Sequence, residues 1–158
     1  MKLVLMITLV VVIMFIAKGV AKQYIDRYDL YVAMKEFFKQ MELNIGFQKQ
    51  KINEILNKSN IKKVNKDIYT SYLEYLTSGK ELDLSFVKII DCDERDYITS
   101  MLVSLGKSDA TSEIKQLKAY EEYLSDKISA CKSEKDKLCP LIIKLSLLFA
   151  LGLVILLI

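Results

Sequence analysis

The residues best suited to chemistry in this chain form one acidic cluster, made up of Asp91, Asp93, Glu94 and Asp96. Closely spaced carboxylates can hold a calcium ion in the loop of an EF-hand. An EF-hand loop that begins at Asp91 needs glycine at its sixth position and glutamate at its twelfth. This chain has Asp96 and Leu102 there. We therefore interpret the cluster as the first turn of a helix near Asp93, where acidic side chains face the positive end of the helix dipole.

Other reactive groups are scarce. The sequence has no histidine, so the commonest general base and metal ligand is missing. Its three cysteines are Cys92, Cys131 and Cys139. If the last two share a helix, they lie about 12 Å apart, too far for a disulfide. A zinc site is not expected without a Cys-x-x-Cys pair. We expect no catalytic residue, no cofactor and no metal.

Two apolar segments stand at opposite ends of the chain, Leu3 to Ala17 and Leu141 to Ile158. A helix needs about 20 apolar residues to cross a bilayer, and flanking lysines extend a shorter run because their stems reach the interface. The sequence therefore predicts an N-terminal transmembrane helix over residues 1–21 and a C-terminal one over residues 139–158.

A cleaved signal peptide is the alternative for the first segment, because Lys2 is followed by an apolar core. Residues 17–21 read Ala-Lys-Gly-Val-Ala, a poor cleavage site with a lysine inside it. The apolar run also continues into a helical pattern, which favours one helix that leaves the membrane.

Lysine and arginine gather on the inner flanks of both apolar segments, which indicates an orientation. Cationic flanks are retained in the cytoplasm, and acidic residues count for little. The outer flanks offer only Lys2. We expect both termini to lie outside and residues 22–138 to form one cytoplasmic domain. The inner cations are Lys18, Lys22, Arg27, Lys132, Lys135, Lys137 and Lys144.

Apolar residues recur at spacings of three and four through the middle of the chain, which predicts an all-α bundle of about six helices. Residues 82–90 alternate in a way that could suit a strand, but a lone strand has no partner here, so we expect a short helix. The expected helices are the continuation of the first span to Gly46, then 47–57, 64–78, 82–90, 93–105 and 110–138, the last running into the second span.

The overall charge is nearly balanced, with 23 Lys and Arg against 20 Asp and Glu. Such a balance does not indicate a nucleic-acid surface. The chain also lacks a nucleophile paired with a base, and its five glycines form no phosphate-binding loop. An enzyme that acts on a lipid through the acidic cluster or a lysine is therefore the weakest of the alternatives.

Four short patterns follow one another along almost the whole chain: Gly19, Ala21, Arg27 and Leu30; Ile45-Gly46-Phe47; Leu105-Gly106-Lys107-Ser108-Asp109; and Gly152 with its aliphatic tail to Ile158. As an ordered set between two terminal spans, they resemble the stage III sporulation protein AB family of endospore-forming bacteria. In that family a glutamine usually follows the signature aspartate by four residues, whereas this chain has Glu113.

The resemblance implies a non-catalytic platform or scaffold subunit in the mother-cell membrane around the forespore, within a channel-like, secretion-like complex. The soluble domain is then similar to the inner-membrane platform proteins of type II secretion and type IV pilus machines. The implied partners are other stage III sporulation subunits, in particular a cytoplasmic ATPase, and the lipid bilayer, with no nucleic acid and no small-molecule substrate.

The family pattern also selects Arg27, Gly106, Asp109 and Glu113 as structural or partner-interface positions. Three of them have structural explanations: Gly106 as a helix stop, Asp109 as an N-cap and Arg27 as a cation near the headgroups. A membrane-tethered helical sensor or tether unrelated to secretion is the alternative function.

Overall fold

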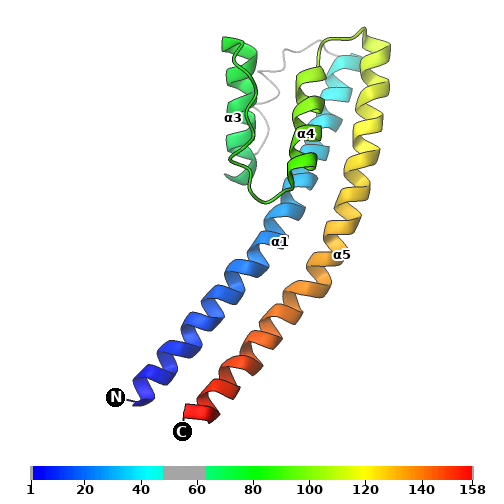
Figure 1. The fold of residues 1–158 in the computed structure, drawn as a ribbon. Helices are drawn as coiled ribbons and strands as arrows, with labels where there is room; N and C mark the ends of the chain where they lie inside the picture. Colours follow the sequence, from blue (N-terminus) through cyan, green and yellow to red (C-terminus); the bar gives the residue numbers. More distant parts are fainter. Residues whose placement is uncertain (1, 48–62, 158) are drawn as a thin grey trace. The chain divides into compact units, whose positions relative to one another are not determined.

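The computed structural model describes residues 2–47 and 63–157, which form α-helices and connecting turns with no strand. The helices are α1 (Lys2–Phe47), α3 (Lys63–Ser78), α4 (Cys92–Ser104) and α5 (Ala110–Leu157), shown in Figure 1. The chain divides into two compact units. We call residues 1–28 with 129–158 the span unit and residues 29–128 the central unit. The all-α prediction is confirmed.

The expected count of about six helices is not confirmed, and the helix predicted over residues 82–90 is wrong. Leu84, Val87 and Ile90 are buried at three-residue spacing, which imitates a helix. The Asp83 carboxylate instead accepts hydrogen bonds from the backbone N–H and hydroxyl of Ser85, at 2.8 and 3.0 Å. These bonds favour a turn over a helix. Most of the helix predicted at 47–57 lies outside the described residues, and Phe47 itself ends α1.

The other predicted helix ends agree with the structure to within two residues. α1 continues one residue past Gly46. α3 ends at Ser78, and Gly79 follows with φ of 66° while its N–H donates to the Tyr75 carbonyl at 3.0 Å. A glycine in this left-handed conformation is a common way to close a helix, because it lacks the Cβ that would clash.

The span unit is an antiparallel pair formed by the first part of α1 and the last part of α5, with the two chain ends side by side (Figure 1). Small side chains lie between the helices: Ala17 and Ala21 are each 5% exposed, and Ala150 is fully buried. Small residues four apart let two membrane helices approach closely.

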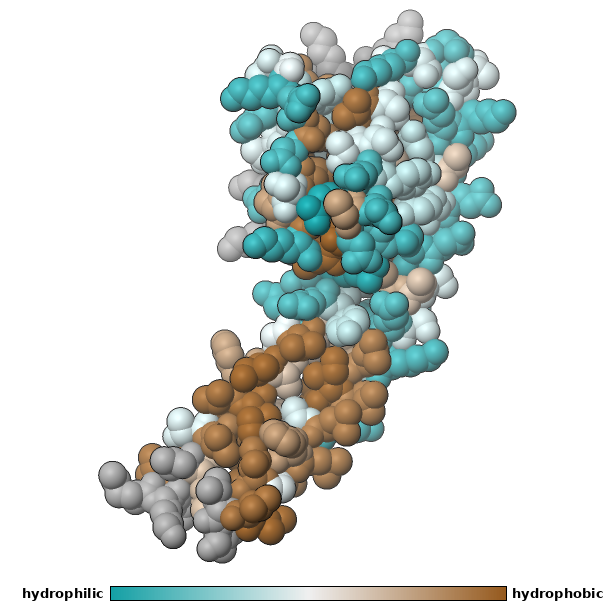
Figure 2. All heavy atoms as spheres, in the orientation of Figure 1, coloured by the Kyte–Doolittle hydropathy of each residue, from teal (hydrophilic) through white to brown (hydrophobic). Residues whose placement is uncertain are grey.

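The remaining surface of the span unit is apolar. Both helices are long and apolar enough to cross a membrane, with mean hydropathy of 1.8 and 2.5 over their most apolar windows. Only 11% and 6% of those windows are buried, so most of their side chains point outward. Figure 2 shows this surface in brown, whereas the central unit is mainly teal and white. Apolar helices with such exposed faces fit association with a membrane.

A shallow groove of about 720 Å³ runs along the span unit. Its lining is apolar except for one hydroxyl, and consists of Ile13, Ile16, Ala17, Val20, Ile142, Leu145, Ser146, Leu148 and Phe149.

The core of the central unit is built from apolar stripes on four helical segments. Rings from three of them meet: Phe37 packs on Tyr69 with centroids 5.1 Å apart, and Phe38 packs on Tyr120 at 5.6 Å. Each large side chain that is fully buried contributes roughly 1.5–3 kcal/mol relative to exposure. Those stripes include Leu30, Tyr31 and Met34 of α1, Ile68 and Tyr72 of α3, Ile98, Met101 and Leu102 of α4, and Leu117 and Leu124 of α5.

Candidate functional site

Three of the four predicted positions lie together where α4 connects to α5: Gly106 and Asp109 in the turn, and Glu113 in the first turn of α5. Gly106 has φ of 77°, which suits glycine far better than any other residue. Asp109 caps α5 as predicted, because its Oδ2 accepts a 3.2 Å hydrogen bond from the Ser112 N–H. Its carbonyl also accepts a hydrogen bond from the Glu113 N–H at 2.9 Å. The hydrogen bond from Ser112 holds the pKa of Asp109 below its usual value.

Glu113 lies beneath this turn, with only 3% of its surface exposed. Its Oε1 accepts a 2.8 Å hydrogen bond from the Gly106 N–H. The Glu113 side chain therefore links the start of α5 to the residue at which the chain leaves α4. Its Oε2 is buried and has no hydrogen-bond partner within the described residues. Gly106 and Asp109 are exposed, so the turn presents a surface that is rigid because Glu113 holds it from below.

Near this carboxylate, the Tyr72 hydroxyl of α3 is also buried without a hydrogen-bond partner in the described part of the chain. Burial raises the pKa of Tyr72 well above its usual value, and the charges of Tyr75 and Glu113 raise it further. The charge of Glu113 therefore acts on α3 as well as on the turn.

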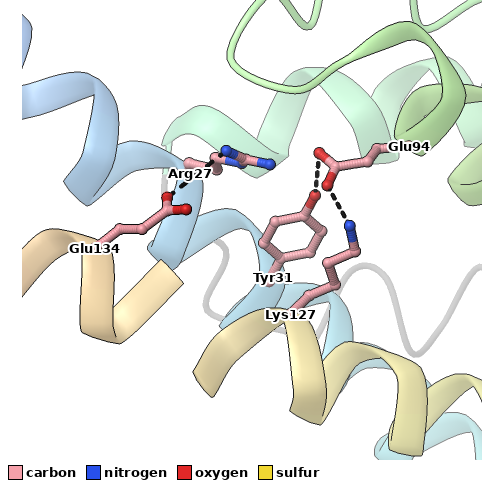
Figure 3. A network of polar contacts seen from close by, with 5 residues as sticks. All are labelled: Arg27, Tyr31, Glu94, Lys127 and Glu134. Carbon is pink, nitrogen blue, oxygen red and sulfur yellow. Dashed lines mark hydrogen bonds and ion pairs between the residues drawn. The ribbon is translucent and has the colours of Figure 1, made fainter. Parts of the chain in front are cut away.

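A second polar cluster, which the sequence patterns did not reveal, centres on Glu94 of α4. Its Oε2 accepts a 2.7 Å hydrogen bond from the Tyr31 hydroxyl of α1, and its Oε1 pairs with the Lys127 ammonium of α5. Figure 3 shows the carboxylate between these two groups. Glu94 is 7% exposed and Tyr31 is fully buried, whereas about a third of the Lys127 side chain is exposed. One carboxylate thus joins three helices of the central unit.

The sequence predicts that Glu94 and its acidic neighbours lie in the first turn of a helix and face the positive end of its dipole, and Glu94 does lie in the first turn of α4. Asp91, Asp93 and Asp96 are indeed exposed, although Asp91, at the N-cap position, makes no capping hydrogen bond through its side chain. Glu94 faces inward because it lies four and seven residues before Ile98 and Met101, which are buried on the same helix. This helical spacing could have predicted the burial of Glu94, but grouping Glu94 with the three aspartates as one acidic cluster hid it. No group of three acidic or cysteine side chains able to hold a metal occurs in the residues described.

Arg27, the fourth predicted position, lies in the span unit and not with the other three. Its guanidinium is 3.8 Å from the Glu134 carboxylate, also drawn in Figure 3. Both side chains are partly exposed, at 26% and 46%, so the pair contributes little free energy. Its position between an apolar segment and the central unit in sequence suits a cation near the headgroups.

The chain matches a family described as stage III sporulation protein AB over residues 2–158, nearly its full length. No curated protein and no solved structure matches it.

Proposed function

Because this chain belongs to the stage III sporulation protein AB family, we propose that it is a non-catalytic platform subunit of a secretion-like complex in the membrane of the sporulating mother cell. Membership of the family supports a role in sporulation, since the match covers residues 2–158. That match carries the proposal, and the two apolar helices agree with a protein held in a membrane.

The proposed topology places both termini outside and the central unit in the cytoplasm. Its support is the distribution of cations in the span unit, where all Lys and Arg except Lys2 lie at the ends of the apolar segments nearer the central unit in sequence. A cytoplasmic central unit is accessible to a soluble ATPase, which we propose as the principal partner together with other stage III subunits.

The turn from Gly106 to Asp109 is the part of the central unit that we propose as the partner surface. It is exposed, and its backbone is held by the Asp109 cap and by the buried Glu113 carboxylate. A preformed surface loses little conformational entropy on binding, which favours recognition. The exposed side chains of Lys107 and Ser108 are available there for polar contacts.

Co-purification from sporulating cells tests the proposal. After mild detergent extraction, the native chain should bring down an ATPase and other stage III subunits. A Lys107→Ala and Ser108→Ala variant should lose these partners without a change in thermal stability, because both side chains are exposed and neither forms a hydrogen bond or ion pair within the part of the chain that the structure describes. A Lys39→Ala variant, which loses the same single positive charge from an exposed site elsewhere on the central unit, should keep them.

Absence of an ATPase from the native preparation, together with normal spore formation after deletion, would contradict the platform role. Production of the protein during vegetative growth would favour the alternative of a membrane-tethered sensor or tether.

A further inference from the structure

Two contacts between α1 and α5 set the relative depth of residues in the span unit. The Cys139 thiol donates to the Ala21 carbonyl at 3.4 Å, and the Ser146 hydroxyl, which donates to the Ile143 carbonyl of its own helix at 2.8 Å, lies 3.7 Å from the Met14 sulfur. Seven residues separate the two contacts on each helix, so the antiparallel register is maintained between them. Residues at the same level on the two helices therefore have numbers that add up to about 160.

This register arranges four lysines in two tiers, each with one lysine from each helix. Lys18 and Lys144 lie within two residues of the same level, or about 3 Å along the axis. Lys22 and Lys137 lie within one residue, or about 1.5 Å. All four side chains are exposed, and none forms an ion pair among the residues that the structure describes. We call them the lysine belt.

The acidic residues of the span unit do not neutralise this belt. The span unit has eight Lys and Arg but only three Asp and Glu, whereas the central unit has 15 Lys and Arg and 17 Asp and Glu. Glu134 pairs with Arg27, and Asp136 pairs with Lys135. Lys135 also lies 4.0 Å from the centre of the Tyr28 ring. The third acid, Asp26, forms no ion pair within the described residues. The belt lysines, together with Lys132, therefore carry the unpaired positive charge between the apolar segments and the central unit in sequence.

The depth of the belt fits the phosphate layer of a bilayer. Beyond Lys22 and Lys137, each helix continues for 20 residues, to Lys2 in α1 and to Leu157 in α5. Twenty helical residues span about 30 Å, which is the thickness of the hydrocarbon core. Lys18 and Lys144 lie about 6–10 Å deeper in the hydrocarbon core than Lys22 and Lys137. From that depth a lysine stem can extend its ammonium back to the headgroups.

We propose that the lysine belt binds the phosphate groups of anionic phospholipids, so that the span unit selects these lipids from the surrounding bilayer. The belt has lysines at the same depth on both helices, which favours the phosphate layer of a bilayer as the binding partner. A single protein segment would contact the lysines of only one helix. The apolar surface just beyond the belt, including the groove, would lie against the acyl chains of the same lipids. Anionic leaflets attract such cations with a gain of roughly fivefold in association for each lysine.

Lipid selectivity measured on the full chain tests this proposal. The protein is reconstituted in phosphatidylcholine bilayers that contain spin-labelled phosphatidylglycerol or spin-labelled phosphatidylcholine, and the fraction of each lipid immobilised at the protein is compared. We expect phosphatidylglycerol to be preferred several-fold at low salt, with the preference falling as ionic strength rises. Replacing all four belt lysines by glutamine should bring the ratio close to one, whereas arginine at the same positions should preserve it.

A control variant with glutamine at Lys39, Lys80, Lys88 and Lys115, all exposed in the central unit, loses the same net charge and should keep the preference. Retention after carbonate washing and an unchanged circular dichroism spectrum verify that each variant is inserted and helical. If the four-lysine variant fails to insert, the Lys18→Gln and Lys144→Gln pair and the salt titration of the native chain decide the question. Equal immobilisation of the two lipids by the native chain, or a preference that survives removal of the belt, would overturn the proposal.

Discussion

The Tyr31 hydroxyl donates a 2.7 Å hydrogen bond to Oε2 of Glu94, which joins two residues 63 positions apart in the sequence. Lys127 engages the other carboxylate oxygen, so α1, α4 and α5 meet at one charge. A buried ion pair often adds little net stability, because desolvation offsets attraction. Removing only one partner of such a pair is costly, however, because the other charge stays buried. A polar contact of this kind can also fix the register in which helices pack.

Lys127→Ala should destabilise the full chain in detergent by about 3 kcal/mol, because it removes the ammonium that pairs with the buried Glu94 carboxylate. Tyr31→Phe should cost about 1.5 kcal/mol, since it removes one hydrogen bond to a charged group. Urea unfolding followed by circular dichroism measures both. Lys118→Ala is the control: its side chain is 67% exposed and 3.8 Å from Glu42, so it should cost no more than about 0.5 kcal/mol. Equal losses for Lys118 and Lys127 would contradict the special role of Glu94.

Asp109→Ala should lower the melting temperature at neutral pH by a few degrees, because the Ser112 N–H loses its acceptor. The pKa of Asp109 is depressed in the folded chain. The stabilisation is therefore present above the unfolded pKa of about 3.9 and is lost as pH falls through the folded pKa. The difference between native and Ala chains should therefore shrink as the pH falls below the unfolded pKa and then through the lower folded pKa. Asp109→Asn, which caps equally well, should show less dependence on pH. A difference that stays constant down to acid pH would contradict the cap.

Glu113→Gln should leave stability within about 1 kcal/mol of the native chain, because the amide oxygen can still accept from the Gly106 N–H. The substitution also replaces the Oε2 atom, which lacks a hydrogen-bond partner in the described part of the chain, by an NH₂ group that can donate to a nearby buried acceptor. Glu113→Ala removes the acceptor and should cost about 2 kcal/mol. Urea unfolding separates the two variants. If glutamine were as damaging as alanine, the charge and not the hydrogen bond would hold the turn.

Much of the central unit could be predicted from sequence because its signals are local. Helical periodicity located α3 and α4, and the Gly79 and Gly106 positions marked helix ends that need left-handed backbone. The 82–90 segment misled because three buried anchors at helical spacing also suit a chain of turns. What decides between them is a side-chain bond from Asp83, which competes with the helix backbone.

The role of Glu94 is not predictable from its neighbours alone. Its partners come from residues 63 positions before it and 33 after it, so they are known only once the helices are packed. The same holds for Glu113, whose burial depends on the turn folding back over α5.

Ala17→Leu and Ala21→Leu should each weaken the contact between α1 and α5 in the span unit, because their Cβ atoms lie where the helices approach. A loss of about 1–3 kcal/mol is expected from overpacking, seen as faster proteolysis in detergent. Val12→Leu is the matched control, since Val12 is half exposed on the apolar surface and leucine fits there without strain. Unchanged proteolysis for both alanine positions would exclude close packing of the spans.

Cys92 offers the most direct test of a platform whose central unit faces the cytoplasm, because it is exposed in that unit. In a single-cysteine chain, Cys131 is replaced by alanine and Cys139 by serine, whose hydroxyl can still donate to the Ala21 carbonyl. Sporulating cells that carry this single-cysteine chain are treated with a membrane-impermeant maleimide before and after permeabilisation of the membrane. The account predicts that Cys92 reacts only after permeabilisation. Ready labelling of Cys92 in intact cells would place the central unit outside, away from any cytoplasmic ATPase, and would contradict the account.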